Sequence, residues 1–269
     1  MGETVPDHYT YPGTEVLVNI PGYTLPAAWK EAETTVIGAH ARALARNPLP
    51  GGFDLPHLQA IHAALVHGFY TWGGQLRDTD TGPGGTGLAH CRPEFIPAEA
   101  ARIFGALQDM DYLHDRDADT FAKGLAWVWG ETTATHCFRD INTRSQFVFF
   151  NQLAASAGWV IDWNRIDAHV FAHARTVAIH KDELGLDALL YPALIPAAEL
   201  ARRDDLREKM IRAQEAFFTP QPARSREELD KALRAAIDRR AQTARPGPVT
   251  GTGPTATRRP DPPGTGLSL

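Results

Sequence analysis

Apolar side chains at helical spacing are the feature that most restricts the fold of this chain. Asp54, a residue type that caps helix N-termini, opens a segment in which Leu58, Ile61, Leu65 and Phe69 fall on one stripe. Segments 119–136 and 144–158 also have helical patterns, and the second ends at a glycine, as helices often do. We therefore predict an all-α protein.

The chain divides into three predicted parts. Residues 1–200 form a helical body, and residues 201–242 form a C-terminal helical extension that contains an amphipathic helix over 225–242. The tail, 243–269, is rich in Pro, Gly, Thr and Arg and is expected to be disordered, because it holds too little apolar surface to offset the entropy of ordering. Between the helices, polar arms flank a Gly-Pro-Gly-Gly run in segment 75–96, which predicts a small β-hairpin.

Composition excludes several classes of protein. The 269 residues are 43% hydrophobic, enough for a sizeable core, and the net charge of -5 argues against nucleic acid as the main partner. Two cysteines, Cys91 and Cys137, are too few for a disulfide framework and favour a reducing compartment. Neither a signal-peptide pattern nor a run of about 18 apolar residues is present. We expect a cytoplasmic protein with no membrane partner.

The segment from Thr135 to Phe150 concentrates the polar chemistry of the chain. If a helix begins near Asn142, its free N–H groups and positive dipole end face the loop that holds His136 and Asp140. A phosphate bound there would contact the amides and Arg144, with Mg²⁺ on Asp140 and His136 as a base. A plainer interpretation stays open: Asp140 or Asn142 caps the helix, Arg144 pairs with Asp140, and His136 is an ordinary loop histidine.

Other histidines do not predict a metal site. His57, His62 and His67 are five residues apart, which turns about 140° on a helix, so we expect surface or boundary positions. His169 and His173 share a helix face, but the sequence between them lacks the glutamate of a zinc-hydrolase helix and no third ligand is evident. The glycine-rich run at 82–87 does not match a P-loop.

The pattern His136-x-Phe138-Arg139-Asp140-x-Asn142-x-Arg144 resembles the Fic-domain motif, H-x-F-x-[D/E]-G-N-G-R-x-x-R. Segments that begin at Tyr11, Asn47 and Gly84 follow in the order typical of that family, so the resemblance extends over roughly residues 9–180. It implies an all-α fold with a β-hairpin flap over a nucleotide site. It also implies transfer of AMP from ATP to a Ser, Thr or Tyr hydroxyl of a protein; some members move phosphate, UMP or phosphocholine instead.

The resemblance also implies roles for individual residues. By position, the base is His136, the loop anchor is Phe138, the Mg²⁺ ligand is Asp140, and the phosphate-binding residues are Asn142, Thr143 and Arg144. The flap residues Gly84, Gly85 and Thr86 would hold an extended target segment by strand pairing.

Three positions depart from the motif. Ile141 and Thr143 replace its glycines, and Phe147 replaces its last arginine. Isoleucine at positive φ requires either a different loop shape or strain of about 1–3 kcal/mol. Phe147 has no donor for the outer phosphates that this arginine normally holds.

Two functions remain open. The first is a Mg²⁺-dependent nucleotidyl or phosphoryl transferase with ATP or another nucleotide as donor and another basic residue as clamp. Its acceptor is a protein hydroxyl or, alternatively, a small metabolite. The second is a Fic domain without turnover that binds a nucleotide or a protein. The inhibitory hexapeptide [S/T]-x-x-x-E-[G/N], which restrains many Fic proteins, is absent from the sequence. We therefore expect one of two situations. Either a separate antitoxin-like partner inhibits the protein, as in a toxin–antitoxin pair, or the protein is not an inhibited toxin.

Overall fold

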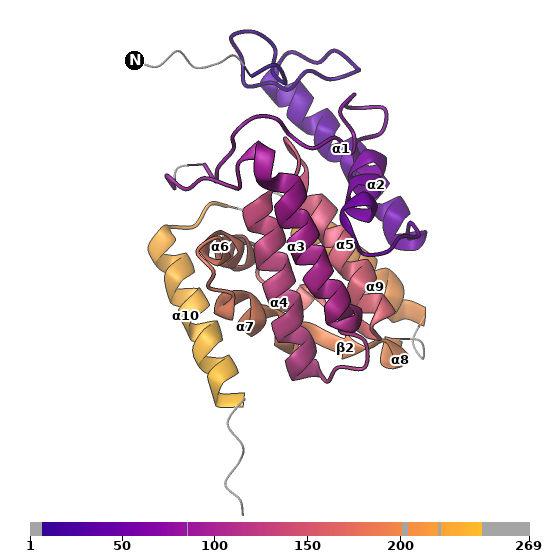
Figure 1. Cartoon of the computed structure of the whole chain (residues 1–269), viewed down its shortest axis with the longest axis vertical. Helices are drawn as coiled ribbons and strands as arrows, with labels where there is room; N and C mark the ends of the chain where they lie inside the picture. Colours follow the sequence, from indigo (N-terminus) through magenta and orange to yellow (C-terminus); the bar gives the residue numbers. More distant parts are fainter. Residues whose placement is uncertain (1–6, 85, 201–203, 220–221, 244–269) are drawn as a thin grey trace, which may run out of the picture.

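The computed structural model describes residues 7–84, 86–200, 204–219 and 222–243, and helices dominate them (Figure 1). The helices are α1 (Pro26–Arg46), α2 (Leu55–Val66), α3 (Ile96–Asp109), α4 (Ala118–Thr135), α5 (Asn142–Ser156), α6 (Ala168–Ala178), α7 (Leu184–Leu190), α8 (Ala197–Leu200), α9 (Asp204–Phe217) and α10 (Arg226–Thr243). Short 3-10 turns lie at η1 (Pro93–Phe95), η2 (Asp111–Leu113), η3 (Trp163–Arg165) and η4 (Tyr191–Ala193). Strands β1 (Trp159–Ile161) and β2 (Leu194–Pro196) pair antiparallel, with Val160 opposite Ile195. The predicted all-α class is confirmed.

Carboxylate caps start several of these helices. Asp54 accepts a hydrogen bond from the His57 N–H at 2.9 Å and begins α2, as its sequence predicts. Asp117 accepts one from the Thr120 N–H at 2.7 Å and begins α4. Because such caps satisfy N–H groups that a helix leaves free, they fix where the elements begin on either side of the site.

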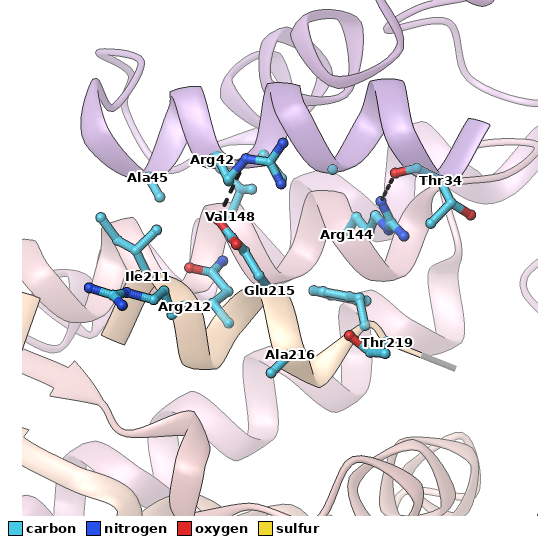
Figure 2. A pocket seen from close by; sticks show the side chains of 14 residues that line it. Thr34, Arg42, Ala45, Arg144, Val148, Ile211, Arg212, Glu215, Ala216 and Thr219 are labelled. Atoms are coloured by element: carbon cyan, nitrogen blue, oxygen red, sulfur yellow. Dashed lines mark hydrogen bonds and ion pairs between the residues drawn. The ribbon is translucent and has the colours of Figure 1, made fainter. Parts of the chain in front are cut away.

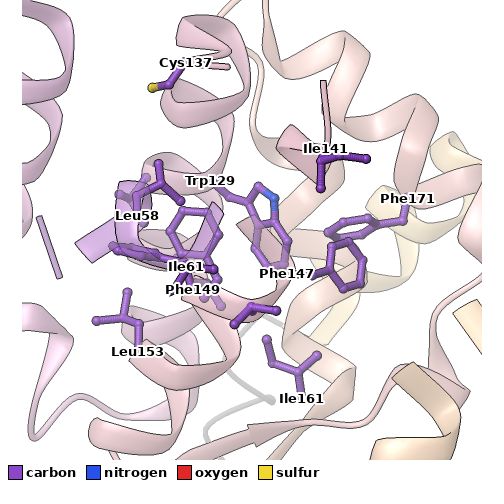
Figure 3. Packing of buried hydrophobic residues seen from close by; sticks show 14 of the residues in the cluster. Leu58, Ile61, Trp129, Cys137, Ile141, Phe147, Phe149, Leu153, Ile161 and Phe171 are labelled. Atoms are coloured by element: carbon purple, nitrogen blue, oxygen red, sulfur yellow. The ribbon is translucent and has the colours of Figure 1, made fainter. Parts of the chain in front are cut away.

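Helices α4 and α5 form the centre of the body. Helix α5 packs against α1, α2 and α4, and α4 packs against α3, α6 and α7 (Figure 1). Their contact surface is aromatic: the ring of Phe147, fully buried, lies 5.3 Å from the Trp129 ring and 5.6 Å from the Phe171 ring between centroids (Figure 3). This core holds the beginning of α5 in place.

The C-terminal helices close the body on two sides. Helix α9 packs against α1 and η3, and α10 packs against α6 and α7. Arg240 on α10 binds Asp187 at 2.9 Å and Asp119 at 2.5 Å. The predicted amphipathic helix over 225–242 is thus confirmed as α10, whereas the predicted disordered tail lies outside the described residues. None of the helices that the structure describes is long and apolar enough to cross a membrane.

The described residues of the segment predicted as a hairpin flap, 75–84 and 86–92, form a loop. Its arms approach each other through a bond of 3.0 Å from the His90 N–H to the Thr81 carbonyl, and a Cβ added to Gly82 would overlap the Leu88 carbonyl. Residues 75–84 and 86–92 nevertheless contain no assigned strand. Aspartate, glycine and proline are poor strand formers, and the arms are short, which accounts for the difference. We keep the name flap for residues 75–92.

The expectation that His57 and His62 are surface or boundary residues is wrong. Their exposed fractions are 4% and 0%, while His67 is exposed. Burial is tolerated because ring nitrogens find backbone partners: His57 Nε2 lies 3.1 Å from the Leu49 carbonyl, and His62 Nδ1 accepts from the Gly74 N–H at 2.8 Å. Burial also lowers the pKa of His62 to about 3, so this ring is neutral.

Candidate active site

The loop between α4 and α5 has left-handed residues at both ends. His136 ends α4 with φ 50° and ψ 65°, and Ile141 precedes α5 with φ 60° and ψ 12°. A β-branched residue in this region costs about 1–3 kcal/mol, so of the two predicted alternatives, a different loop shape or strain, Ile141 shows strain. The loop therefore keeps a backbone conformation suited to glycine even though the glycine is absent.

Asn142 and Phe138 close this loop from inside. The Asn142 side chain accepts from the Phe138 N–H at 2.9 Å and donates to the Phe138 carbonyl at 2.7 Å. Phe138 is 1% exposed, and its ring stacks on His62 at 3.9 Å between centroids. Phe138 thus lies where a loop anchor is expected. The predicted phosphate contact of Asn142 stays a prediction, since its amide binds the loop backbone here.

His136 is a half-buried imidazole beneath the flap. Its ring is stacked on that of His90 at 3.8 Å and 5°, and its Nδ1 has no hydrogen-bond partner among the described residues. Burial lowers the pKa of His136 well below its ordinary value, and His90, Arg175, Arg77 and Arg139 lower it further. His136 is therefore neutral at pH 7 and able to accept a proton. Burial, with Arg77 and Arg175, lowers the pKa of His90 to about 4.

Asp140 and Arg144 lie toward α1. The Asp140 carboxylate accepts from the Ile141 N–H at 2.6 Å, and burial raises its pKa, as does the nearby charge of Glu33 on α1. The Arg144 guanidinium donates to the Thr34 carbonyl at 3.5 Å and lies 5.0 Å from the Phe218 ring. Burial lowers the pKa of Arg144, while Glu33 and Asp140 raise it, so these three groups share one neighbourhood.

Arg144 lines a cavity of about 610 Å³ between α1, α5 and α9. Figure 2 shows Arg144 below α1, to the right of an ion pair of 3.6 Å between Arg42 and Glu215. His136 does not line this cavity. Of the predicted site residues, Asp140 and Arg144 lie near Glu33 of α1. Thr143 instead accepts a hydrogen bond from Arg175, whose charge also acts on His136.

Sequence reasoning missed three residues around His136. Arg175 on α6 donates to the Thr143 hydroxyl at 2.9 Å, His90 stacks on His136, and Arg77 donates to the His136 carbonyl at 2.7 Å. All three are distant from the motif in sequence, and nothing in their local pattern marks them. Two predicted flap residues, Gly84 and Thr86, are exposed, and Gly85 lies outside the described residues.

Replacing His90 by alanine is expected to raise the pKa of His136 toward its ordinary value of about 6.5. The substitution removes the ring that covers His136, and both burial and proximity to His90 lower that pKa. Titration of the His136 ring proton by NMR measures the change. The exposed His67→Ala serves as control, and an unchanged His136 pKa in His90→Ala would contradict the assignment.

Comparison with known proteins places the chain among Fic proteins. Residues 52–154 match the model of the Fic/DOC family. The chain is 35% identical over 172 residues to a probable protein adenylyltransferase of Sinorhizobium fredii, covering 63% of this chain and 86% of that protein. It is 31% identical over 193 residues to the probable protein adenylyltransferase Fic of Salmonella typhimurium, covering 72% and 94%.

Among solved structures, the N-terminal Fic domain of a Bartonella quintana effector protein with bound ADP superposes with a TM-score of 0.67. Its sequence identity is 24%, and the match covers 72% of this chain and 98% of that one. At 24% identity this likeness shows the fold alone. That fold agrees with the sequence motif and with the relatives. The chain belongs to the Fic/DOC family.

Proposed function

We propose that the protein transfers AMP from ATP to a hydroxyl group of a protein. Membership in the Fic/DOC family and the relatives named as protein adenylyltransferases support this reaction class. The observation that carries the proposal is His136, a half-buried neutral imidazole at the end of α4, one short loop before the amide-rich start of α5. A base and an anion site side by side are what such a transfer needs.

In this mechanism His136 takes the proton from a Ser, Thr or Tyr hydroxyl of the acceptor. The hydroxyl oxygen attacks the α-phosphorus of ATP and forms a new P–O bond, while the bond from that phosphorus to the β-bridging oxygen breaks and pyrophosphate leaves. Free N–H groups at the start of α5, the Thr143 hydroxyl and Arg144 offset charge on the phosphates. The exposed flap residues Gly84 and Thr86 give an extended acceptor segment a place to lie.

The residues around Asp140 fit Mg²⁺. Among the described residues the Asp140 carboxylate forms no ion pair, and it lies near a second acid, Glu33. The described part of the chain contains no group of three or more Asp, Glu, His or Cys side chains that could by itself hold a metal ion. Mg²⁺ bound to a nucleotide, however, needs only one or two carboxylates, with phosphates and waters as its other ligands. Asp140 would hold the ion, which would supply positive charge to the phosphates.

Incubation with isotope-labelled ATP and host lysate tests the proposal. We expect label from the α-phosphate on a macromolecule with the wild-type protein and its loss with His136→Ala, because that variant lacks the base. Parallel reactions with labelled UTP, GTP and CTP identify the donor, and His67→Ala is the exposed-histidine control. Nucleotide binding without any transfer would contradict the transferase.

That last outcome would support a regulatory module instead. Two observations favour it as the second candidate: His90 covers His136, and Phe147 offers no donor to a phosphate. A separate antitoxin-like partner is a further proposal, compatible with either function.

A further inference from the structure

Arg175 is a buried cation without an acidic partner. Its exposed fraction is 7%, and it donates from Nε to the Thr133 hydroxyl at 3.3 Å, from one terminal nitrogen to the Thr143 hydroxyl at 2.9 Å, and from the other to the Gln146 side-chain oxygen at 2.8 Å. These acceptors are all neutral, and no carboxylate of a described residue pairs with Arg175. Arg240, by contrast, is equally buried and binds two aspartates.

An unpaired buried charge is costly to folding, so its presence requires a reason. Burial lowers the pKa of Arg175 to about 10, which still leaves the guanidinium charged at neutral pH. Three of its five N–H bonds point to the neutral oxygens, so donors remain for another acceptor. A bound anion would supply the missing negative charge.

The position of Arg175 fits an anion at the start of α5. The first helical bond of α5 runs from the Ser145 N–H to the Ile141 carbonyl at 3.0 Å, so the amides of residues 142–144 precede it. Thr143, which Arg175 contacts, is the second residue of α5. The bond from Arg175 to Thr143 thus places the cation at the helix start, and its charge also lowers the pKa of the proposed base, His136.

Pairs of residues that face each other across α5 and α6 show where Arg175 lies relative to position 147, where the family motif has its last arginine. On α5, Thr143 and Phe147 are four residues apart and share a face; on α6, Phe171 and Arg175 do the same. One pair of facing residues is apolar, with the Phe147 and Phe171 rings 5.6 Å apart. The next pair is polar and joins Arg175 to Thr143. The cation is thus provided by the neighbouring helix, one turn closer to His136.

We propose that Arg175 binds the phosphate groups of the nucleotide donor in place of the arginine absent at position 147, an inference that rests on the proposed transferase site. Two N–H bonds of its planar guanidinium remain for phosphate oxygens.

Binding of inorganic tripolyphosphate to the full chain tests Arg175 without requiring turnover. Calorimetric titration and thermal unfolding are measured for the wild-type protein, Arg175→Gln and Arg175→Lys. The matched control, Arg240→Gln, removes a buried arginine that has carboxylate partners. We expect Arg175→Gln to lose at least about tenfold in affinity and Arg175→Lys to fall between it and wild type. Arg240→Gln should have a lower Tm but wild-type affinity. Adenosine should bind all four proteins alike.

Several outcomes would overturn the proposal. They are wild-type protein that does not bind tripolyphosphate, Arg175→Gln that binds within twofold of wild type, and an equal loss in Arg240→Gln. If Arg175→Gln does not fold, Arg175→Lys decides: affinity equal to wild type would mean that the fork geometry has no role, and would overturn the proposal. The two proposals fail separately. If tripolyphosphate binds through Arg175 but no AMP is transferred, only the proposed transferase activity is refuted. If Arg175→Gln transfers AMP as wild type does, only the proposed phosphate binding by Arg175 is refuted.

Discussion

Replacing Phe147 by arginine should unfold the protein, although it would restore the last arginine of the family motif. The Phe147 ring is 0% exposed and lies 4.2 Å from the Trp163 ring and 4.8 Å from each of the Phe217 and Phe218 rings, between centroids. Loss of such a ring costs about 3–5 kcal/mol, and an unpaired charge in its place adds several more. The sum approaches the total stability of about 5–15 kcal/mol typical of a folded domain.

Urea unfolding followed by tryptophan fluorescence measures this change. Phe147→Leu is the control, because it keeps the position apolar and should lower the free energy of unfolding by only about 1–3 kcal/mol. If the free energy of unfolding of Phe147→Arg were instead within about 2 kcal/mol of wild type, the aromatic packing around α5 would contribute less to stability than we assign to it.

Replacing Arg77 by methionine is expected to lower the free energy of unfolding by about 3–5 kcal/mol, because several carbonyls lose their donor and a buried unsatisfied acceptor costs about 1–3 kcal/mol. Arg77 is 2% exposed and donates to four carbonyls: those of His136 at 2.7 Å, Thr79 at 2.8 Å, Thr135 at 3.2 Å, and Cys91. It thereby joins both arms of the flap to the C-terminal end of α4, where a cation also interacts favourably with the helix dipole. Methionine fills the space but leaves these carbonyls without a donor.

Chemical denaturation of Arg77→Met gives the magnitude, and NMR of the His90 and His136 ring protons reports whether their stack persists. Arg92→Met nearby is the comparison: its exposed side chain makes a surface ion pair of 3.7 Å with Glu94, and its loss should change stability by less than about 0.5 kcal/mol. Equal effects of the two substitutions would show that Arg77 does not hold the flap.

Features that depend on residues close together in the sequence were predicted correctly. The cap at Asp54, the helix that contains Phe147 and the amphipathic pattern of α10 each depend on residues within a few turns of one another. The strain at Ile141 was one of the two predicted outcomes for the same reason, since a positive φ is a property of one residue in one loop.

Features that depend on contacts between distant segments were not predicted. Arg175 follows Thr143 by 32 residues, and Phe217 follows Phe147 by 70, so no periodicity within a helix could pair them. The burial of His62 depends on an N–H from Gly74, outside its own helix. The prediction of a hairpin at the flap failed because its turn residues are present but its arms are short and contain aspartates, which are poor strand formers.

The aromatic cluster at Phe147 also limits how this site can change over evolutionary time. Because Phe217 and Phe218 at the end of α9 fit an aromatic ring at position 147, a return to arginine there would first require those two residues to become smaller or polar. Each of those earlier steps would by itself open the core. The departure from the family motif is therefore hard to reverse by single substitutions, and the fitness effect of a residue at position 147 depends on a helix about seventy residues away.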